Sequence, residues 1–427
     1  MLQIFLFMAI HFPTAAWATK ATIYEVNLRQ YSHEGSFLAF AKHLPRLKDM
    51  GIDILWMMPI TPIAQKGRLG TLGSYYACSS YVKTNSEFGS IADFKQLVNE
   101  AHGLGMKVII DWVANHTGLD HEWTVSHPEY YQQDVYGNFT ERNGWKDVID
   151  LNYQNASMRN ALIVAMQFWI TECKIDGFRC DMAHLVPLDF WKEARKQCDP
   201  LRSLYWLAEC ETNEYHTVFD TTYAWEWMHT TEKQIKGDCS LNDVYKVLHS
   251  YTQIGDGTSK LLFTSNHDEN SWNGTEYDKY GLAAKAMAVF TCTWKAMPLI
   301  YSGQENANRK KLAFFEKDVL QWQQPVVLHD FYKALLALHK SPAIYLGETH
   351  ILPSPHPQVM LYVRKSGDSV VLVALNLSAA DKIRFVVQHE WLNGTFVSIF
   401  SQIHYSFEPG TSFEINSYGY LVYAKLD

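Results

Sequence analysis

The sequence lacks the cysteine patterns that mark zinc sites and disulfide-rich folds. Its 427 residues include seven cysteines, an odd number, and no two of them form a CxxC pair. A zinc site or a full disulfide framework is therefore not predicted. We expect most of the cysteines to be buried thiols, with room for one or two disulfides if the protein is exported.

An excess of positive charge is also missing. Lysine and arginine together number 37, against 45 aspartates and glutamates, which gives a formal net charge of −8. Such a chain has no basic field to attract phosphates. Nucleic acid is therefore not an expected partner.

Long apolar runs are missing as well, so no membrane span is predicted. Residues 2–13 are mostly apolar but too short to cross a bilayer, and Ala16-Trp17-Ala18 matches the A-x-A pattern cut by signal peptidases. Residues 1–18 are therefore predicted to be a signal peptide, which implies a secreted or periplasmic protein. The first residues carry no lysine or arginine, so an ordinary apolar N-terminus and a cytoplasmic protein are the alternative.

Apolar and aromatic residues are abundant. Apolar residues make up 47% of the chain and charged residues 19%, which is typical of a globular protein. The aromatic residues, at 14%, suit a protein that binds sugars, because pyranose faces stack on rings, although core packing explains most of them equally well. The length fits one large barrel and one small domain, and we expect a monomer.

Eight short β-rich runs alternate with helical patterns between about residues 22 and 340. This alternation is typical of βα units around a parallel sheet, and eight strands close a (β/α)8 (TIM) barrel. The fold is thus predicted to be α/β, with a catalytic barrel over residues 19–341. The predicted strands cover residues 21–31, 52–60, 106–113, 175–181, 204–210, 217–223, 260–268 and 298–305.

Local signals support two of the intervening helices. Ser90 and Asp93 form a capping-box pattern before an apolar face that ends near Gly103, and residues 156–172 carry a second helical pattern. Between the third strand and that second helix lies a polar, aromatic insertion at 117–150, too long for an ordinary βα loop. We expect it to lie over the open end of the barrel.

After residue 341 the pattern changes. Short β-rich runs at 360–365, 369–377, 394–400 and 418–426 alternate with turns rich in Gly, Asn, Pro and Ser. Residues 342–427 are therefore predicted to form a C-terminal antiparallel β-domain.

Four acidic residues fall at the ends of predicted strands: Asp111, Asp181, Glu209 and Asp268. Barrel enzymes place their chemistry on this rim, with residues from several strands. Any one of these residues alone is explained equally well as a helix cap or a turn residue. Four carboxylates on one rim repel one another and lose solvation, which costs stability. The cluster therefore indicates a functional site.

The neighbours of two of these acids suggest different protonation states. The strand period of two places Arg179 on the same side as Asp181, and a guanidinium there favours an ionised carboxylate, as a nucleophile requires. Glu209 follows the apolar run 204–208, where burial would raise its pKa and keep it protonated, as a general acid requires.

Four short segments contain the acids and their neighbours: Asp111-Trp-Val-Ala-Asn-His116, Gly177-Phe-Arg-Cys-Asp181, Ala208-Glu-Cys210 and Phe263-Thr-Ser-Asn-His-Asp268. They resemble the short conserved regions of the α-amylase family, glycoside hydrolase family 13, and stand in the family's order and roughly its spacing. The similarity extends from about residue 20 to the end and includes Gly73-Ser-Tyr-Tyr76.

The resemblance implies a role for each matched catalytic position. Asp181 would be the nucleophile that forms a β-glucosyl ester, and Glu209 would be the acid and then the base. Asp268 would hold the sugar hydroxyls. Retaining hydrolysis requires the first two carboxyls to lie about 5–5.5 Å apart and predicts an α-configured product.

It also implies the residues that bind the substrate: His116 and His267 would hydrogen-bond the same glucose, Arg179 would orient the nucleophile, Tyr76 would stack on the ring and Asp111 would buttress the pocket. For the two histidines the alternative is an ordinary core imidazole.

Two positions leave alternatives open. His184 stands where many amylases have a Lys-His pair, and it either serves an acceptor subsite or lies on a helix face. Asn115 matches a calcium ligand of the family, but the other ligands cannot be placed in the short insertion. No cofactor is required by the chemistry, and calcium is left open.

These patterns predict a hydrolase of α-glucosidic bonds in starch-like polysaccharides or maltooligosaccharides, with α-1,4 as the expected linkage. One alternative is a glucanotransferase that passes the same intermediate to a sugar acceptor. Another is a non-catalytic glycan-binding relative, which would normally have lost one of the three acids.

Overall fold

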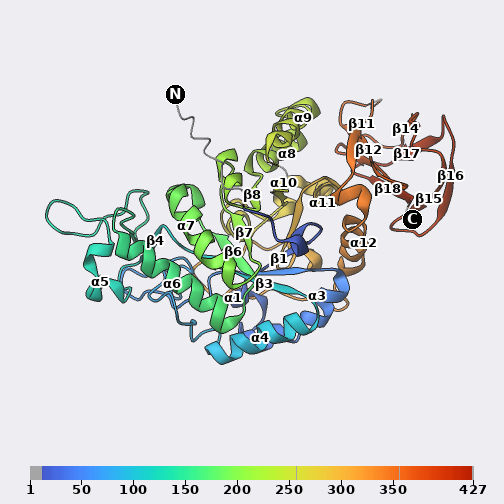
Figure 1. The fold of residues 1–427 in the computed structure, drawn as a ribbon. Helices are drawn as coiled ribbons and strands as arrows, with labels where there is room; N and C mark the ends of the chain where they lie inside the picture. Colours follow the sequence, from blue (N-terminus) through green and yellow to red (C-terminus); the bar gives the residue numbers. More distant parts are fainter. Residues whose placement is uncertain (1–11, 256, 355, 426–427) are drawn as a thin grey trace, which may run out of the picture.

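The computed structural model describes residues 12–255, 257–354 and 356–425. Eight parallel strands form a closed barrel in the order β1-β10-β9-β8-β7-β6-β3-β2 (Figure 1). This confirms the predicted fold class. The barrel strands are β1 (Ile23–Val26), β2 (Ile54–Met57), β3 (Lys107–Trp112), β6 (Gly177–Cys180), β7 (Tyr205–Ala208), β8 (Thr221–Tyr223), β9 (Ser259–Leu262) and β10 (Met297–Tyr301).

Each barrel strand lies inside a predicted run, or within one residue of it, but several runs extend past the end of the strand, two of them by five or six residues. The run 21–31 stops at Val26, and Leu28–Tyr31 forms the short helix α1, in which Arg29 is buried against Glu87 at 3.0 Å. The run 260–268 leaves the sheet after Leu262. In both cases the contacts that the residues after the strand make outweigh their β-propensity.

Helices surround the barrel, as Figure 1 shows. The capping box at Ser90 is present, and the helix it begins, α4, ends at Gly103. Only a short 3-10 turn connects β7 to β8. The helices are α2 (Phe37–Ala41), α3 (Leu44–Met50), α4 (Ile91–Gly103), α6 (Ala156–Cys173), α7 (Leu188–Cys198), α8 (Trp225–Lys236), α9 (Leu241–Ser250), α10 (Glu276–Tyr280), α11 (Ala284–Thr293), α12 (His329–His339) and α13 (Pro342–Tyr345).

Gly177 illustrates why the barrel requires a particular residue at the start of β6. A Cβ at this position would lie 2.0 Å from the carbonyl oxygen of Tyr205 on the neighbouring strand. Only glycine allows β6 and β7 to approach this closely. The residues that directly follow these two strands, Asp181 and Glu209, are two of the four acids.

The insertion folds around a small antiparallel pair, β4 (His116–Gly118) with β5 (Val148–Asp150), and contains the helix α5 (Trp123–Ser126). In the view of Figure 1 it lies on the opposite side of the barrel from the C-terminal domain.

The C-terminal domain is an antiparallel sheet of order β11-β12-β13-β18-β15-β16 with a separate pair, β14 and β17. In β12, Met360 and Tyr362 join the core shared with the barrel, while Leu361 and Val363 join a second core. Both faces are therefore buried, which explains the continuous apolar run. The strands are β11 (Glu348–Ile351), β12 (Val359–Ser366), β13 (Ser369–Asn376), β14 (Ile383–Val386), β15 (Gly394–Ser398), β16 (His404–Phe407), β17 (Ser412–Ile415) and β18 (Tyr420–Lys425).

The predicted signal peptide lies partly outside the described residues, which begin at Phe12. The described part packs on the barrel: Ala18 is buried, and the Trp17 indole donates a hydrogen bond to the Ser203 carbonyl at 3.3 Å. All seven cysteines are described and are free, and six of them are buried. Within the described chain, no helix has the length and apolar character needed to cross a membrane.

Candidate active site

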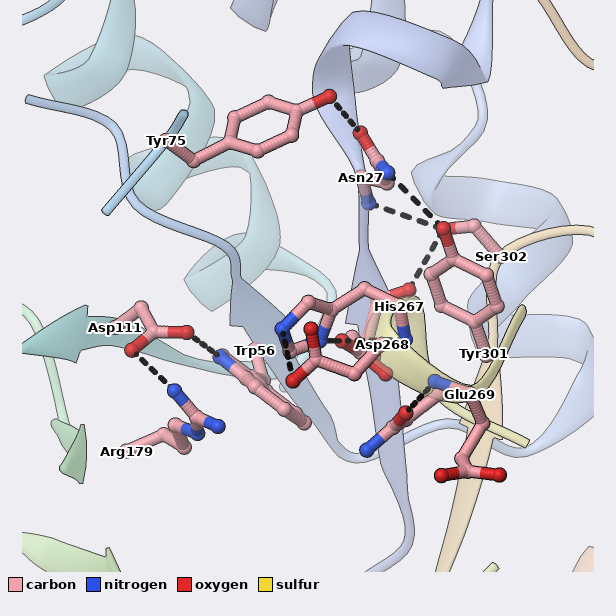
Figure 2. A network of polar contacts seen from close by, with 12 residues as sticks. Asn27, Trp56, Tyr75, Asp111, Arg179, His267, Asp268, Glu269, Tyr301 and Ser302 are labelled. Carbon is pink, nitrogen blue, oxygen red and sulfur yellow. Dashed lines mark hydrogen bonds and ion pairs between the residues drawn. The ribbon is translucent and has the colours of Figure 1, made fainter. Parts of the chain in front are cut away.

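Asp111 is the centre of a buried polar network inside the barrel. Its Oδ1 accepts a hydrogen bond from Arg179 Nη1 at 2.9 Å. Its Oδ2 accepts hydrogen bonds from the Trp56 indole at 3.2 Å and from the Tyr76 hydroxyl at 3.1 Å. Figure 2 shows Asp111 between Trp56 and Arg179. Burial raises the pKa of Asp111, and the Arg179 guanidinium opposes that rise.

One fully buried guanidinium serves three carboxylates. Besides Asp111, Arg179 contacts Asp181 through Nη1 at 3.1 Å and Glu209 through Nη2 at 2.7 Å. The contact with Asp181 is a hydrogen bond, whereas the contact with Glu209 is an ion pair without hydrogen-bond geometry. A single positive charge cannot neutralise three carboxylates, so the site has a reason to retain a proton.

Strand register places Asp181 and Glu209 beside each other. The neighbouring parallel strands β6 and β7 pair Cys180 with Ala208, and the two acids are the next residues. Neighbouring strands lie about 4.8 Å apart. Asp181 and Glu209 therefore lie at the same level of the barrel rim, at the ends of adjacent strands.

The two acids affect each other's ionisation. Burial raises the pKa of Asp181 well above its usual range, and the nearby Glu209 raises it further, while Arg179 lowers it. Burial also raises the pKa of Glu209. Two carboxyls with this much interaction titrate as a pair, and the pair keeps one proton at a pH where isolated carboxyls are ionised.

The chain after Asp181 is turned toward Glu209. Met182 has the left-handed conformation, φ 40° and ψ 46°, which costs a non-glycine residue about 1–3 kcal/mol. Its N–H donates to Glu209 Oε2 at 2.8 Å, and the N–H of Ala183 donates to the Glu209 carbonyl at 3.1 Å. The strain at Met182 thus aims a backbone donor at one oxygen of Glu209.

His267 joins Asp268 to a buried carboxylate on the first strand. Its Nδ1 lies 2.5 Å from Glu25 Oε1, and its Nε2 lies 3.3 Å from Asp268 Oδ2. Burial alone would lower the pKa of His267, but Asp268 and Glu25 raise it well above its usual range. The imidazolium in turn outweighs burial and lowers the pKa of Asp268. Asp268 is therefore an ionised carboxylate with a side chain that is 36% exposed.

We expect Glu25→Gln to lower the pKa of His267, so that its imidazolium loses the proton at a lower pH. Glu25 helps to hold that proton, and an amide in its place carries no negative charge to stabilise the imidazolium. The measurement is titration of the His267 ring by NMR, with Glu414→Gln in an exposed C-terminal ion pair as the control. An unshifted His267 titration in a folded Glu25→Gln protein would contradict this role.

The other residues that the sequence predicts to bind substrate, Tyr76, His116 and His184, lie in three different surroundings. The Tyr76 hydroxyl lies 2.7 Å from His267 Nε2, so Tyr76 is tied into the network. His116 is buried beside the Trp145 ring, and burial lowers its pKa to about 4, so its imidazole is neutral. His184 is exposed on the 3-10 turn Ala183–Leu185, close in the chain to Asp181 but outside the carboxylate network.

Sequence reasoning missed three residues of the network. Glu25 and Trp56 lie on β1 and β2, and Tyr223, on β8, accepts a hydrogen bond from Arg179 Nε at 3.2 Å. Glu25 carried a detectable signal, because it is the one charged residue in the apolar run Ile23–Val26. A charge within a strand of a closed barrel is rarely tolerated without a partner.

Asp268 differs from its predicted place at a strand end. It follows β9 by six residues and precedes a helical turn at Glu269–Asn273. The turn begins because Asn266 Oδ1 accepts the N–H of Glu269 at 2.8 Å. Asp268 therefore reaches the network from a loop.

The surroundings of Asn115 do not fit a calcium ion. Its Oδ1 accepts a hydrogen bond from Arg142 Nη2 at 3.2 Å, so a positive charge already contacts the oxygen that would bind the metal. Within the described residues, no group of three or more His, Cys, Asp and Glu side chains could hold a metal ion.

A closed parallel barrel with two neighbouring carboxyls on its rim is an arrangement suited to a barrel enzyme that hydrolyses glycosidic bonds. The family model described as "Alpha amylase, catalytic domain" matches residues 29–146 and 130–324, and that of "Maltogenic Amylase, C-terminal domain" matches 349–422. The chain belongs to the α-amylase family, glycoside hydrolase family 13.

Solved structures and curated relatives agree with this. The chain resembles a noncanonic maltogenic α-amylase from Thermotoga neapolitana, with 30% identity, a TM-score of 0.88 and coverage of 96% of this chain and 100% of that one. An α-amylase from Lactobacillus plantarum gives 27% identity, a TM-score of 0.87 and the same coverage. An α-amylase of Haloarcula japonica is 27% identical over 85% of this chain, which spans 56% of that relative's length.

Proposed function

We propose that the protein is a retaining hydrolase of α-glucosidic bonds, with α-1,4 as the expected linkage, in starch-like polysaccharides or maltooligosaccharides. The observation that carries this proposal is the placement of Asp181 and Glu209 on adjacent strands, at one level, against one guanidinium. The spacing of adjacent strands suits the carboxyl separation of about 5–5.5 Å that a double displacement requires.

We assign the proton of the pair to Glu209. The double displacement needs an ionised nucleophile and a protonated acid. The hydrogen bond from the charged Arg179 favours the ionised form of Asp181 against its burial, whereas the Arg179 contact with Glu209 lacks hydrogen-bond geometry. Asp181 then attacks the anomeric carbon while Glu209 gives its proton to the leaving oxygen. The same Glu209 next takes a proton from water, which opens the glucosyl ester and restores both groups.

Asp268 and His267 supply the binding groups nearest the reaction centre. The exposed part of the Asp268 carboxylate can accept hydrogen bonds from sugar hydroxyls, and its negative charge favours an oxocarbenium-like transition state. His267 keeps this carboxylate ionised.

A cleft beside the network suits a chain of sugars. It has a volume of about 460 Å³ and is lined by Trp272, Phe314 and Phe315. Phe314 lies nearly parallel to Tyr76, with ring centroids 6.3 Å apart, and Trp272 is 51% exposed. The exposed Trp272 ring and the partly buried Phe314 and Phe315 rings offer stacking surfaces for successive pyranose faces.

We expect an α-configured first product from maltotriose, observed by NMR before mutarotation. Because two displacements each invert the anomeric carbon, net retention follows. Parallel incubations with starch, pullulan and cyclodextrin define the bond that is cut. A β-configured first product would contradict the mechanism, and longer transfer products in excess of free sugars would identify a glucanotransferase instead.

Export and oligomeric state stay predictions from the sequence. We propose a secreted or periplasmic monomer. N-terminal sequencing of the mature protein and its mass in solution test these two points.

A further inference from the structure

Arg142 connects three separate segments near the active site. Its Nη2 donates to Asn115 Oδ1 at 3.2 Å and to the Leu185 carbonyl at 3.3 Å, and its Nε lies 3.3 Å from Asp150 Oδ2. Asn115 follows β3, Asp150 ends β5, and Leu185 ends the 3-10 turn after Asp181. One side chain thus joins the insertion to the barrel and to the segment that follows the nucleophile.

The partners of Arg142 form a set of oxygen atoms. One is an amide oxygen, one a carboxylate oxygen and one a backbone carbonyl, and Asn115 and Asp150 are each 1% exposed. Oxygen atoms of these three kinds are the ligands that calcium prefers. In this chain a guanidinium lies among them, and its planar donors satisfy them directly.

The loop that carries Arg142 is held in a fixed shape. The Glu141 carboxylate accepts the backbone N–H groups of Asn143, Gly144 and Trp145 at 2.5, 2.6 and 2.9 Å. The Trp145 ring then packs edge-on against His116, with centroids 5.1 Å apart. The Arg142 side chain therefore extends from a turn whose backbone these hydrogen bonds hold in place.

We propose that Arg142 takes the position of a structural calcium ion at Asn115 and is a positioning residue for the insertion and for the turn after Asp181. The cation is part of the chain, so the fold does not depend on free calcium. A divalent ion at the same oxygens would face the positive guanidinium at close range, and this repulsion excludes it. Removal of the guanidinium leaves an empty group of oxygens.

The first test compares the wild-type protein with Arg142→Ala. Wild type is expected to keep the same Tm in EDTA and in millimolar calcium. Arg142→Ala is expected to melt about 2–4 °C lower in EDTA and to regain much of this loss in calcium. Arg384→Ala, which breaks an exposed pair with Glu414, is the matched control and should respond to neither.

The second test detects the metal directly, independently of activity. Terbium emission sensitised by Trp145 is expected for Arg142→Ala, with displacement by calcium, and is not expected for wild type. Asn115→Ala in the Arg142→Ala background removes one of the oxygens and should abolish the emission. Arg142→Gln, which keeps much of the side chain's length but not its charge, repeats the measurements if the alanine variant fails to fold.

Three results would overturn the proposal. They are a wild-type Tm that falls in EDTA, a folded Arg142→Ala with an unchanged Tm, and Arg142 variants that bind no terbium or calcium. None of these readouts depends on the proposed hydrolysis, so failure of one conclusion is distinguishable from failure of the other.

Discussion

Asp181→Asn is expected to reduce kcat for α-glucan hydrolysis by roughly 10³-fold or more, which corresponds to about 4 kcal/mol of transition-state stabilisation. The amide cannot form the glucosyl ester, and no other carboxylate on the rim occupies its register next to β7. Because Asn has nearly the same size, we expect the fold to persist, and thermal melting checks this.

The companion variant Glu209→Gln separates the two roles. With starch, the kcat of Glu209→Gln should fall by about 10²–10⁴-fold, because the leaving oxygen is no longer protonated. With a glucoside whose leaving group needs no proton, such as a nitrophenolate, formation of the ester should persist in Glu209→Gln but not in Asp181→Asn. Added azide should then accelerate turnover of the Glu209 variant, since it attacks the ester without a general base.

A matched control is Asp189→Asn. Asp189 lies on the outer helix α7, and its exposed carboxylate pairs with Arg159. It should retain wild-type rates. Undiminished hydrolysis by Asp181→Asn would place the site elsewhere. Equal loss by both variants on the activated substrate would mean that Glu209 does not act as the acid.

Among the substitutions proposed for this protein, Arg179→Ala is expected to lower the free energy of unfolding the most. The side chain is fully buried and contacts three buried carboxylates, so its removal leaves them without a positive partner. Breaking a buried ion pair in this way typically costs about 3–5 kcal/mol in the free energy of unfolding. Urea unfolding monitored by fluorescence measures the difference from wild type.

The three carboxylates determine whether the stability loss of Arg179→Ala grows or shrinks as the pH rises. Without Arg179 the pKa values of Asp111, Asp181 and Glu209 rise further above those of the unfolded chain, because burial is no longer opposed. Groups whose pKa is raised by folding destabilise the fold above their unfolded pKa. The deficit of Arg179→Ala should therefore be smallest near pH 4 and grow toward pH 7.

Arg384→Ala is again the control, since an exposed pair contributes about 1 kcal/mol or less. Arg179→Lys keeps the charge without the planar fork and should fall between the two. A deficit for Arg179→Ala that shrinks as the pH rises would contradict the electrostatic account.

Much of the architecture could be predicted because periodicity and strand-end chemistry are local properties. The alternation of β-rich and helical runs predicted the eight strands, and the Arg179/Asp181 spacing predicted that both side chains face the barrel interior. The Ser90 capping box located the start of α4 within a residue. Expectations failed where a segment leaves the sheet. At Leu28–Tyr31 the reason is a contact of Arg29 with the distant Glu87, and before Asp268 it is a side-chain hydrogen bond from the Glu269 N–H to Asn266.

The sequence alone determined the class of fold, the order of the acids along the strands and the family, because these depend on patterns within short segments. Only the tertiary structure decided that Glu25 supports His267, that one guanidinium serves three carboxylates, and that Arg142 contacts Asn115. Partners separated by 27 to 242 residues meet only when the barrel closes. Their distances and shared charges, which set the protonation of the site, have no local signature.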